Sequence, residues 1–383
     1  MHYRSNKNQI FSFTYITVVK TVKINPKIPS YVLTILSNVT LLYSKFDLSF
    51  MFKGKKILIT GGTGSLGHAL TKRLLQSKAE QVRIFSRNES KQVEMETKFN
   101  DARLRFFIGD VRDLQRLTFA LEDVDIVFHA AALKHVPKIE YNPFEAIKTN
   151  VVGSQNVIDA CLHQNVEKAI CIGTDKAVSP LNTYGATKLL MEKLFVSAKN
   201  YYNPERHKTK FLVLRYGNVL ASSGSVIPRF IEQIQNKQKI TITDPKMTRF
   251  SITMDDALDF ILTATELGQG SEIFVPKLRA YSIMDVKQVL IELLEDTGEE
   301  HVGIRPGEKL HETLISNDEI RYGWELNNLY ILFNPISNIT KIKKLYQNIK
   351  PIGNMDSYSS DKVDKIPKTE LKQIIKNYVL LNM

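Results

Sequence analysis

The feature that most constrains this chain is a glycine-rich turn that follows a short apolar run. Residues 55–67 read K-K-I-L-I-T-G-G-T-G-S-L-G, with Gly61, Gly64 and Gly67 at intervals of three. The run Ile57–Ile59 is typical of a buried strand, and an apolar stripe at helical spacing follows the last glycine. Glycines at this place permit a tight turn, close approach of the backbone to a pyrophosphate, and close packing of helix on strand. The turn therefore predicts a dinucleotide-binding unit with phosphates at the helix N-terminus.

The rest of the first half repeats the alternation of strand and helix. Apolar runs bounded by polar residues recur between helix-like stretches, which is typical of parallel βαβ units. We therefore expect an α/β fold, a Rossmann-like doubly wound parallel sheet with a smaller C-terminal substrate-binding lobe. The predicted strands are residues 56–60, 82–86, 104–108, 124–129, 168–173 and 211–216. Beyond them we predict helices at about 225–237, 255–267, 283–297 and 369–380, and short strands at 240–242 and 272–275.

A second motif lies at residues 174–188, which read T-D-K-A-V-S-P-L-N-T-Y-G-A-T-K. On a helix, Tyr184 and Lys188 are four residues apart and share a face. An ammonium beside a phenol favours the ionised phenol, which suits a base for a sugar hydroxyl. A tyrosine and a lysine at this spacing occur often by chance, so the prediction gains its weight from the glycine-rich turn upstream.

Together the two motifs resemble the extended short-chain dehydrogenase/reductase family. Within it, further segments are similar to the inverting UDP-N-acetylglucosamine 4,6-dehydratases, from about residue 51 to about residue 334. The tripeptide Thr174-Asp175-Lys176 is typical of this branch, whereas ordinary epimerases of the wider family lack the Asp-Lys pair. The other segments are G-D-V-R-D (109–113), H-A-A-A-L-K-H-V-P (129–137), K-T-N (148–150), R-Y-G-N-V (215–219), M-T-R-F (247–250) and R-P-G-E-K-L-H-E (305–312).

The resemblance implies roles for five residues in the dehydration of a UDP-sugar. Tyr184, assisted by Lys188, takes the O4 proton while the C4 hydride passes to the cofactor. Lys176 then removes the C5 proton, Asp175 protonates the leaving C6 hydroxyl, and Thr174 binds the O4 region. The alternative is a UDP-sugar 4-epimerase of the capsule type, which would return the hydride to C4. A more distant alternative is a non-catalytic NADP-binding sensor.

The end of the second predicted strand bears on the cofactor. An NAD site usually has a carboxylate there, but this chain has Ser86 and Arg87, with Lys91 nearby and Glu89 as the one opposing feature. A guanidinium can bind a 2′-phosphate with two hydrogen bonds, so we predict NADP, tightly bound, rather than NAD. The candidate cofactor-binding residues are Gly61, Thr63, Gly64, Ser65, Leu66, Gly67, Arg87, Lys91, Asp110, Val111, Ala130, Ala131, Ala132, Tyr184 and Lys188.

Cations and polar groups in the family motifs are the candidates for binding the nucleotide sugar. The candidate substrate-binding residues are Lys134, Asn218, Arg249, Arg305 and Glu308. His129 and His135 lack a third ligand at useful spacing, so we predict no metal site. Cys161 and Cys171 lie in apolar surroundings and are interpreted as packing thiols, which is typical of a reducing cytoplasm.

Four segments are predicted from these patterns. They are an N-terminal extension (1–50), an NADP-binding Rossmann domain (51–217) interleaved with a nucleotide-sugar-binding lobe (218–334), and a basic C-terminal tail (335–383). The formal charge is +12, and much of it lies in the two ends, which argues against a general nucleic-acid surface. We expect a cytoplasmic homo-oligomer without stable membrane insertion, because the longest apolar stretch of the extension is too short to span a bilayer. We interpret residues 1–50 as a wrongly assigned start, with a poorly ordered arm or a membrane-touching segment as alternatives.

Overall fold

The computed structural model describes residues 51–382, apart from 201, 204, 221–224, 337–339 and 341–343. Our predictions for residues 1–50 lie outside this part of the chain. The described residues belong to one compact unit, which spans Leu48–Met383.

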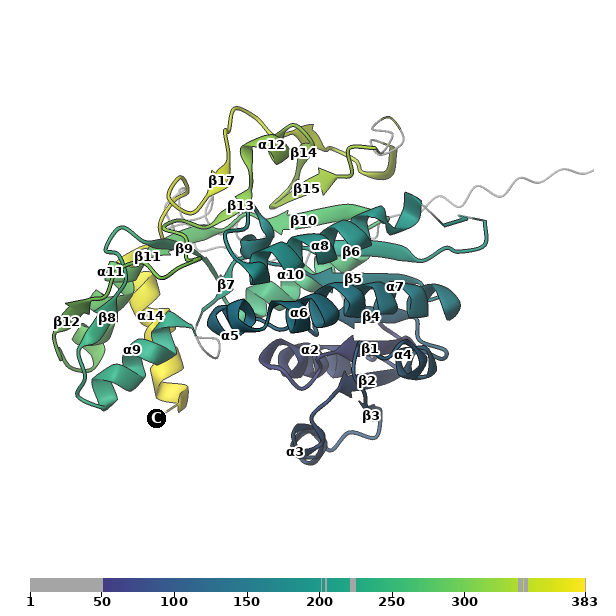
Figure 1. Ribbon diagram of the computed structural model, residues 1–383, viewed down its shortest axis with the longest axis horizontal. Coiled ribbons are helices and arrows are strands. Elements are labelled where there is room, and N and C mark those ends of the chain that lie inside the picture. The colour runs from purple at the N-terminus through teal and green to yellow at the C-terminus, as the bar shows by residue number, and fades with distance from the viewer. Residues whose placement is uncertain are drawn as a thin grey trace, which may run out of the picture. The chain divides into compact units, whose positions relative to one another are not determined.

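A large sheet forms the centre of the unit (Figure 1). Its first six strands are parallel and lie in the order β3-β2-β1-β4-β5-β6, which confirms the predicted doubly wound arrangement. The strands are β1 (Lys56–Thr60), β2 (Gln81–Ser86), β3 (Leu104–Ile108), β4 (Ile126–His129), β5 (Lys168–Ile172) and β6 (Lys210–Leu214).

Helices cover both faces of this sheet, and the strand residues alternate between them. In β1, Ile57 and Ile59 pack in one buried cluster with Leu70 of α2, while Leu58 packs in the other with Val157 of α7. This explains why the strands are apolar runs rather than alternating patterns. The connecting helices are α2 (Ser65–Gln76), α3 (Glu89–Phe99), α4 (Leu114–Ala120), α5 (Val136–Tyr141), α6 (Pro143–Ala146), the π-helix η1 (Ile147–Val152), α7 (Gly153–His163) and α8 (Thr183–Ser197). Two 3-10 turns, η2 (Asp175–Ala177) and η3 (Ala198–Asn200), flank α8.

The chain after β6 contributes to two places. Four strands extend the large sheet, in the order β6-β10-β15-β14-β16, and all but the β6–β10 pair are antiparallel. The helix α10 (Met254–Leu267) packs against α2 on one face of the sheet. The four strands are β10 (Glu272–Pro276), β14 (Gly323–Leu326), β15 (Leu329–Phe333) and β16 (Lys350–Pro351).

A smaller lobe surrounds its own buried cluster, built from α9, α11 and α14 (Figure 1). The C-terminal helix thus packs against elements more than 70 residues earlier in the chain. The elements of this part are β7 (Asn218–Val219), α9 (Val226–Gln235), β8 (Ile240–Ile242), β9 (Thr248–Ile252), β11 (Arg279–Ser282), α11 (Ile283–Leu293), β12 (Glu299–His301), β13 (Thr313–Ile315), α12 (Asn317–Ile320), β17 (Tyr358–Ser359) and α14 (Lys368–Asn382).

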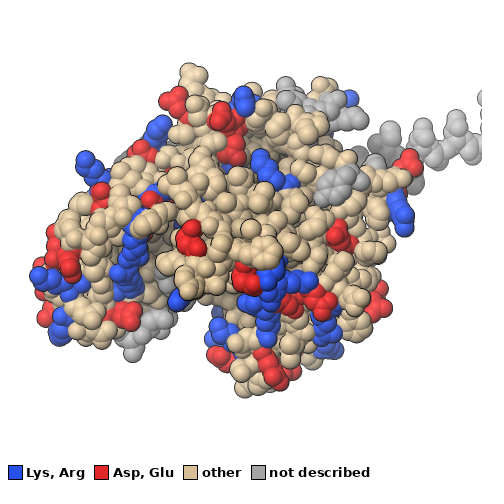
Figure 2. Space-filling model, viewed as in Figure 1, with Lys and Arg blue, Asp and Glu red and all other residues tan. Residues whose placement is uncertain are grey.

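Acidic and basic side chains are interspersed on the face shown in Figure 2. Among the described residues, no helix is both long and apolar enough to cross a membrane. Cys161 and Cys171 are free and fully buried in the core, and burial raises the pKa of the Cys171 thiol to about 12.

Candidate active site

The glycine-rich turn between β1 and α2 has the geometry that dinucleotide binding requires. Gly61 has a φ of +68°, and an added Cβ would lie 2.9 Å from the backbone of Ala131. A Cβ on Gly67 would lie 2.2 Å from the carbonyl oxygen of Gly62, so α2 reaches the turn only with glycine there. The residue at the N-cap of α2 is Gly64, which has no side chain to accept hydrogen bonds from the first helical amides. These amides can therefore bind other acceptors. These residues fit a bound pyrophosphate, and Thr63, Ser65 and Leu66 lie in the same turn.

The predicted 2′-phosphate contacts, Arg87 and Lys91, follow the carboxyl end of β2. The Arg87 side chain is 58 % exposed, and one of its guanidinium nitrogens lies 3.9 Å from the Asp110 carboxylate. Lys91 is exposed on the first turn of α3. Burial raises the pKa of Asp110, but hydrogen bonds from Arg112 outweigh this effect and lower it overall. The guanidinium groups of Arg87 and Arg112 thus both lie beside the Asp110 carboxylate.

Small residues line the neighbouring strand end. Ala130, Ala131 and Ala132 follow β4, and the amide of Ala130 donates to the carbonyl of Thr60 at 3.2 Å. Val111, three residues after β3, is buried. His129 ends β4 inside the core, where its ring nitrogens bond to Thr60 and Ser154 at 2.8 and 2.9 Å. His135 is exposed, and no cluster of three potential metal ligands occurs in the described part of the chain.

The helix α8 carries Tyr184 and Lys188, and its start is held from two sides. The Asn182 side chain accepts a hydrogen bond from the amide of Gly185 at 2.8 Å and donates to the carbonyl of Gly307 at 2.8 Å. A Cβ on Gly185 would lie 2.3 Å from the carbonyl oxygen of Lys176. Glycine at this position therefore lets the helix approach η2, the short turn that contains Asp175 and Lys176.

The structure pairs Tyr184 and Lys188 differently from the sequence argument. Lys188 Nζ donates to the carbonyl of Ile172 at 2.7 Å, and burial lowers the pKa of this amine. Burial also raises the pKa of Tyr184, and Lys176 and a hydrogen bond with Thr174 oppose that increase. The cation that favours ionisation of Tyr184 in this state is therefore Lys176.

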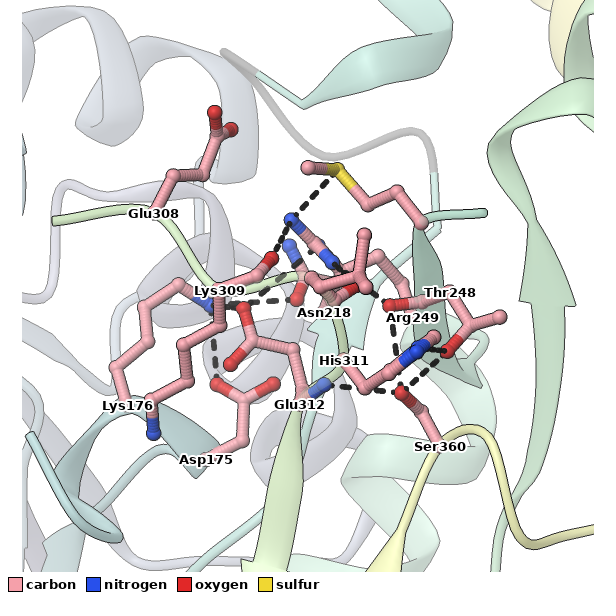
Figure 3. Close-up of polar contacts among 12 residues, drawn as sticks. Asp175, Lys176, Asn218, Thr248, Arg249, Glu308, Lys309, His311, Glu312 and Ser360 are labelled. Atoms are coloured by element: carbon pink, nitrogen blue, oxygen red, sulfur yellow. Dashed lines mark hydrogen bonds and ion pairs between the residues drawn. The ribbon is translucent and has the colours of Figure 1, made fainter. Parts of the chain in front are cut away.

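Asp175 and Lys176 meet Glu312, a residue 136 positions later in the sequence, at the carboxyl ends of β5 and β6 (Figure 3). Lys176 Nζ lies 3.0 Å from Asp175 Oδ1 and 3.4 Å from Glu312 Oε1. It also donates to the Asn218 side-chain oxygen at 3.3 Å. Thr174 donates to Asp175 Oδ1 at 3.0 Å, so contacts through Asp175 and Lys176 link all five side chains.

The two carboxylates of this centre have pKa values shifted in opposite directions. Complete burial raises the pKa of Asp175, Lys176 opposes this, and the charge on Glu312 raises it further. Burial also acts to raise the pKa of Glu312, but Lys176, Arg249 and Lys309 outweigh it and lower it overall. Burial acts to lower the pKa of Lys176, but the charges of the two carboxylates raise it overall. Divergent pKa values within one cluster are the usual sign of an acid–base site.

The predicted substrate-binding residues lie around this centre at different depths. Asn218 contacts Lys176 from β7, and Arg249 on β9 is 7 % exposed with its Nε 3.6 Å from Glu312 Oε1. Arg305 is exposed in the loop before β13, and its amide contacts Glu308 at 3.4 Å. Figure 3 shows Glu308 pointing away from the charged cluster. Lys134 is also exposed, between β4 and α5.

Two residues of this site were missed by the sequence reasoning. Glu312 ends the R-P-G-E-K-L-H-E segment, in which the motif points only to Arg305 and Glu308 as candidates. Asn150, fully buried in η1, holds both the amide and the carbonyl of Leu133 and donates to Thr187 of α8. A π-helix within a longer helix is a known sign of a functional position, but it cannot be seen in the sequence.

Comparisons with known proteins agree with this geometry. Residues 57–334 match the family model described as polysaccharide biosynthesis protein. The chain belongs to this family. It is 47 % identical over 318 residues to a UDP-N-acetylglucosamine 4,6-dehydratase (inverting) of Campylobacter jejuni, covering 81 % of this chain and 94 % of the relative. It is also 42 % identical to a UDP-glucose 4-epimerase of Rickettsia bellii, covering 85 % and 97 %.

Solved structures extend the comparison. The X-ray structure of Pen from Bacillus thuringiensis matches with a TM-score of 0.78 at 41 % identity, covering 86 % of this chain and 99 % of that one. More distant structures of the same fold, at 21–22 % identity, contain bound NAD. The fold and the turn thus support a nicotinamide dinucleotide as the cofactor, whereas neither distinguishes NADP from NAD.

Proposed function

We propose that this protein is a UDP-N-acetylglucosamine 4,6-dehydratase that inverts C5 and uses bound NADP. The observation that carries the proposal is the pair of buried Asp175 and half-buried Lys176 beside Tyr184, because dehydration needs an acid and a base that epimerisation at C4 does not. The family relatives include proteins named for this activity. When bound, the nicotinamide would accept the C4 hydride and later return it to C6.

The first step is removal of the O4 proton. Tyr184 acts as the base, and Thr174 and Lys176 stabilise its ionised form. Lys188 Nζ donates to the carbonyl of Ile172, and this amine would bind the cofactor ribose. Oxidation at C4 makes the C5 hydrogen acidic, so elimination becomes feasible.

The elimination step needs a neutral amine at Lys176 and a protonated carboxyl at Asp175. A proton that moves across their 3.0 Å hydrogen bond produces both at once, without a change in total charge. Burial favours such uncharged partners. The C5–H bond then breaks, its proton passes to Lys176, and its electron pair forms the C5–C6 double bond. The C6–O6 bond breaks, and O6 leaves as water with the proton of Asp175. Once C6 has regained the hydride, C5 takes up the proton that Tyr184 removed from O4, on the face opposite to the one that lost its hydrogen, so its configuration is inverted and all three side chains return to their starting states.

The remaining predicted contacts complete the proposal. Arg87 and Lys91 would bind the 2′-phosphate of NADP, because both are exposed cations at the end of β2 and the start of α3. Lys134, Asn218, Arg249, Arg305 and Glu308 would bind the nucleotide and the diphosphate. Analysis of the nucleotide released on denaturing the purified protein tests the cofactor, and release of NAD alone would contradict the proposal.

The activity is tested by incubating the protein with UDP-N-acetylglucosamine and recording the product mass. Loss of one water with inversion at C5 is the expected result. An unchanged mass with a new sugar would instead identify a 4-epimerase, which the Rickettsia relatives make the second candidate. No reaction would leave a non-catalytic NADP-binding protein.

A further inference from the structure

Glu312 is held rigidly by segments that are distant in the sequence. Its amide donates to Ser360 Oγ at 2.9 Å, and the amide of Ser360 donates to its carbonyl at 2.8 Å. The Ser360 hydroxyl lies 2.8 Å from that of Thr248 on β9. The residue is only 3 % exposed. The position of its carboxylate is therefore set by the fold before any substrate arrives.

The carboxylate of Glu312 has fewer close partners than its burial demands. Oε1 lies between Lys176 Nζ at 3.4 Å and Arg249 Nε at 3.6 Å. Within the described part of the chain, Oε2 has no hydrogen-bond partner, and the same is true of Asp175 Oδ2. Because both residues contact the same Nζ, their free oxygens belong to one charged centre (Figure 3). A buried carboxylate oxygen without a hydrogen bond destabilises the folded state. Its presence in a native fold therefore calls for a functional explanation.

A purely structural role as counter-ion of Arg249 does not explain this arrangement. The guanidinium of Arg249 already donates to the carbonyls of Thr248, Lys309 and Leu310 at 2.7–3.1 Å. Its contact with Glu312 is longer than a hydrogen bond. The closest charged partner of Glu312 is instead Lys176, the group that the proposed reaction needs as a base.

We propose that Glu312 is a positioning residue of the acid–base centre, whose fixed carboxylate holds Lys176 in place and keeps one proton on the Asp175–Lys176 pair during turnover. The inference rests on the proposed dehydratase function. When Lys176 is neutral and Asp175 is ionised, the pair has no proton to give to the leaving hydroxyl. A second, permanent negative charge beside the pair opposes that loss.

The charge of Glu312 also predicts how the pKa values of Asp175 and Lys176 change when that charge is removed. The charge of Glu312 disfavours ionised Asp175 and favours charged Lys176, so it raises the pKa of both groups. Removing the charge lowers both values, whichever of the two residues is the acid, because the two titrations belong to one coupled pair. The other titratable or charged groups that act on the pair or on Glu312 are Tyr184, Arg249, Tyr281 and Lys309.

The experiment compares the pH dependence of kcat for water loss in the wild type, Glu312→Gln and Glu312→Asp. In Glu312→Gln the whole profile should move to lower pH by roughly one to three units, the range of shifts expected for a charge at this distance. KM should change much less than kcat at alkaline pH. Glu312→Asp keeps the charge, so its profile should stay near that of the wild type, with a lower kcat. Glu300→Gln, an exposed change on β12, is the matched control.

The outcomes separate this inference from the proposed function. A wild type that changes the sugar without losing water overturns the function, and the role of Glu312 falls with it. A wild type that dehydrates normally, with a Glu312→Gln profile that coincides with it, overturns the role of Glu312 alone. If Glu312→Gln does not fold, a shifted profile in Glu312→Asp overturns the inference, because that variant retains the charge.

Discussion

The cofactor turn and the acid–base centre are built in opposite ways. The turn is made from residues 61–67, which are consecutive in the sequence, and its requirements are steric: a positive φ and close backbone packing. The acid–base centre draws on η2, β7, β9 and the segment before β13, and its requirements are electrostatic. A local steric demand is visible in residue spacing, whereas a distributed electrostatic one appears only after folding.

The comparison also explains how relatives with different activities can share one fold. Dehydratase and epimerase relatives both match this chain over more than four-fifths of its length. In the proposed mechanism, both activities would use the turn and Tyr184. The difference should therefore reside in the charged centre, where a small change of protonation alters which bond breaks.

The largest effect is expected from Lys176→Ala, which removes the central cation of the acid–base centre and leaves the cofactor turn unchanged. Loss of a positioned general base typically costs about 10²–10⁴-fold in rate. Dehydration should fall by this factor, while cofactor binding and some C4 oxidation persist. Exchange of the C5 hydrogen in heavy water is the measurement, with Lys72→Ala on the exposed side of α2 as the control. Wild-type exchange in Lys176→Ala would show that another group is the base.

The next largest effect, a decrease in the free energy of unfolding, is expected from Arg215→Met. Arg215 is fully buried, binds Glu192 of α8 at 2.7 Å, and donates to the carbonyl of Leu314 next to the Glu312 segment. Removing one partner of a buried ion pair typically costs about 3–5 kcal/mol. Denaturant unfolding should show this decrease. An unchanged unfolding midpoint would mean that the segment is held by other contacts.

A smaller effect, confined to the turn, is expected from Gly67→Ala. The added Cβ would meet the carbonyl oxygen of Gly62 at 2.2 Å, and backbone cannot move aside as a side chain can. Overpacking of this kind costs about 1–3 kcal/mol, and nucleotide affinity should fall with it. Gly353→Ala, where the added atom meets nothing within 4 Å, is the control. Equal melting temperatures and nucleotide affinities for the two variants would contradict the steric argument.

The smallest effect is expected from Arg87→Asp, which should change cofactor preference without harming the fold. The carboxylate would repel a 2′-phosphate and could accept hydrogen bonds from the ribose of NAD. We expect the ratio of NADP to NAD affinity to fall about tenfold, equivalent to ~1.4 kcal/mol. Titration with both nucleotides checks this, and an unaltered ratio would remove Arg87 from the site.

Much of the molecule was predictable because its signals are local. Strand runs such as Ile57–Ile59, the glycine spacing, and the tripeptide Thr174-Asp175-Lys176 each act through residues that are neighbours in the sequence. These signals correctly predicted the doubly wound sheet with its first six strands, and the helices of the smaller lobe.

Only the tertiary structure decided how the charges of the site interact. The sequence predicts that Lys188 acts on Tyr184, and this stays a prediction; the structure adds that Lys188 Nζ donates to the carbonyl of Ile172 and that Lys176 acts to lower the pKa of the phenol. Glu312 could not be recognised, because its importance comes from lying 3.4 Å from Lys176. Burial and Coulomb interactions depend on which groups come within a few ångströms, and distance along the chain does not determine that.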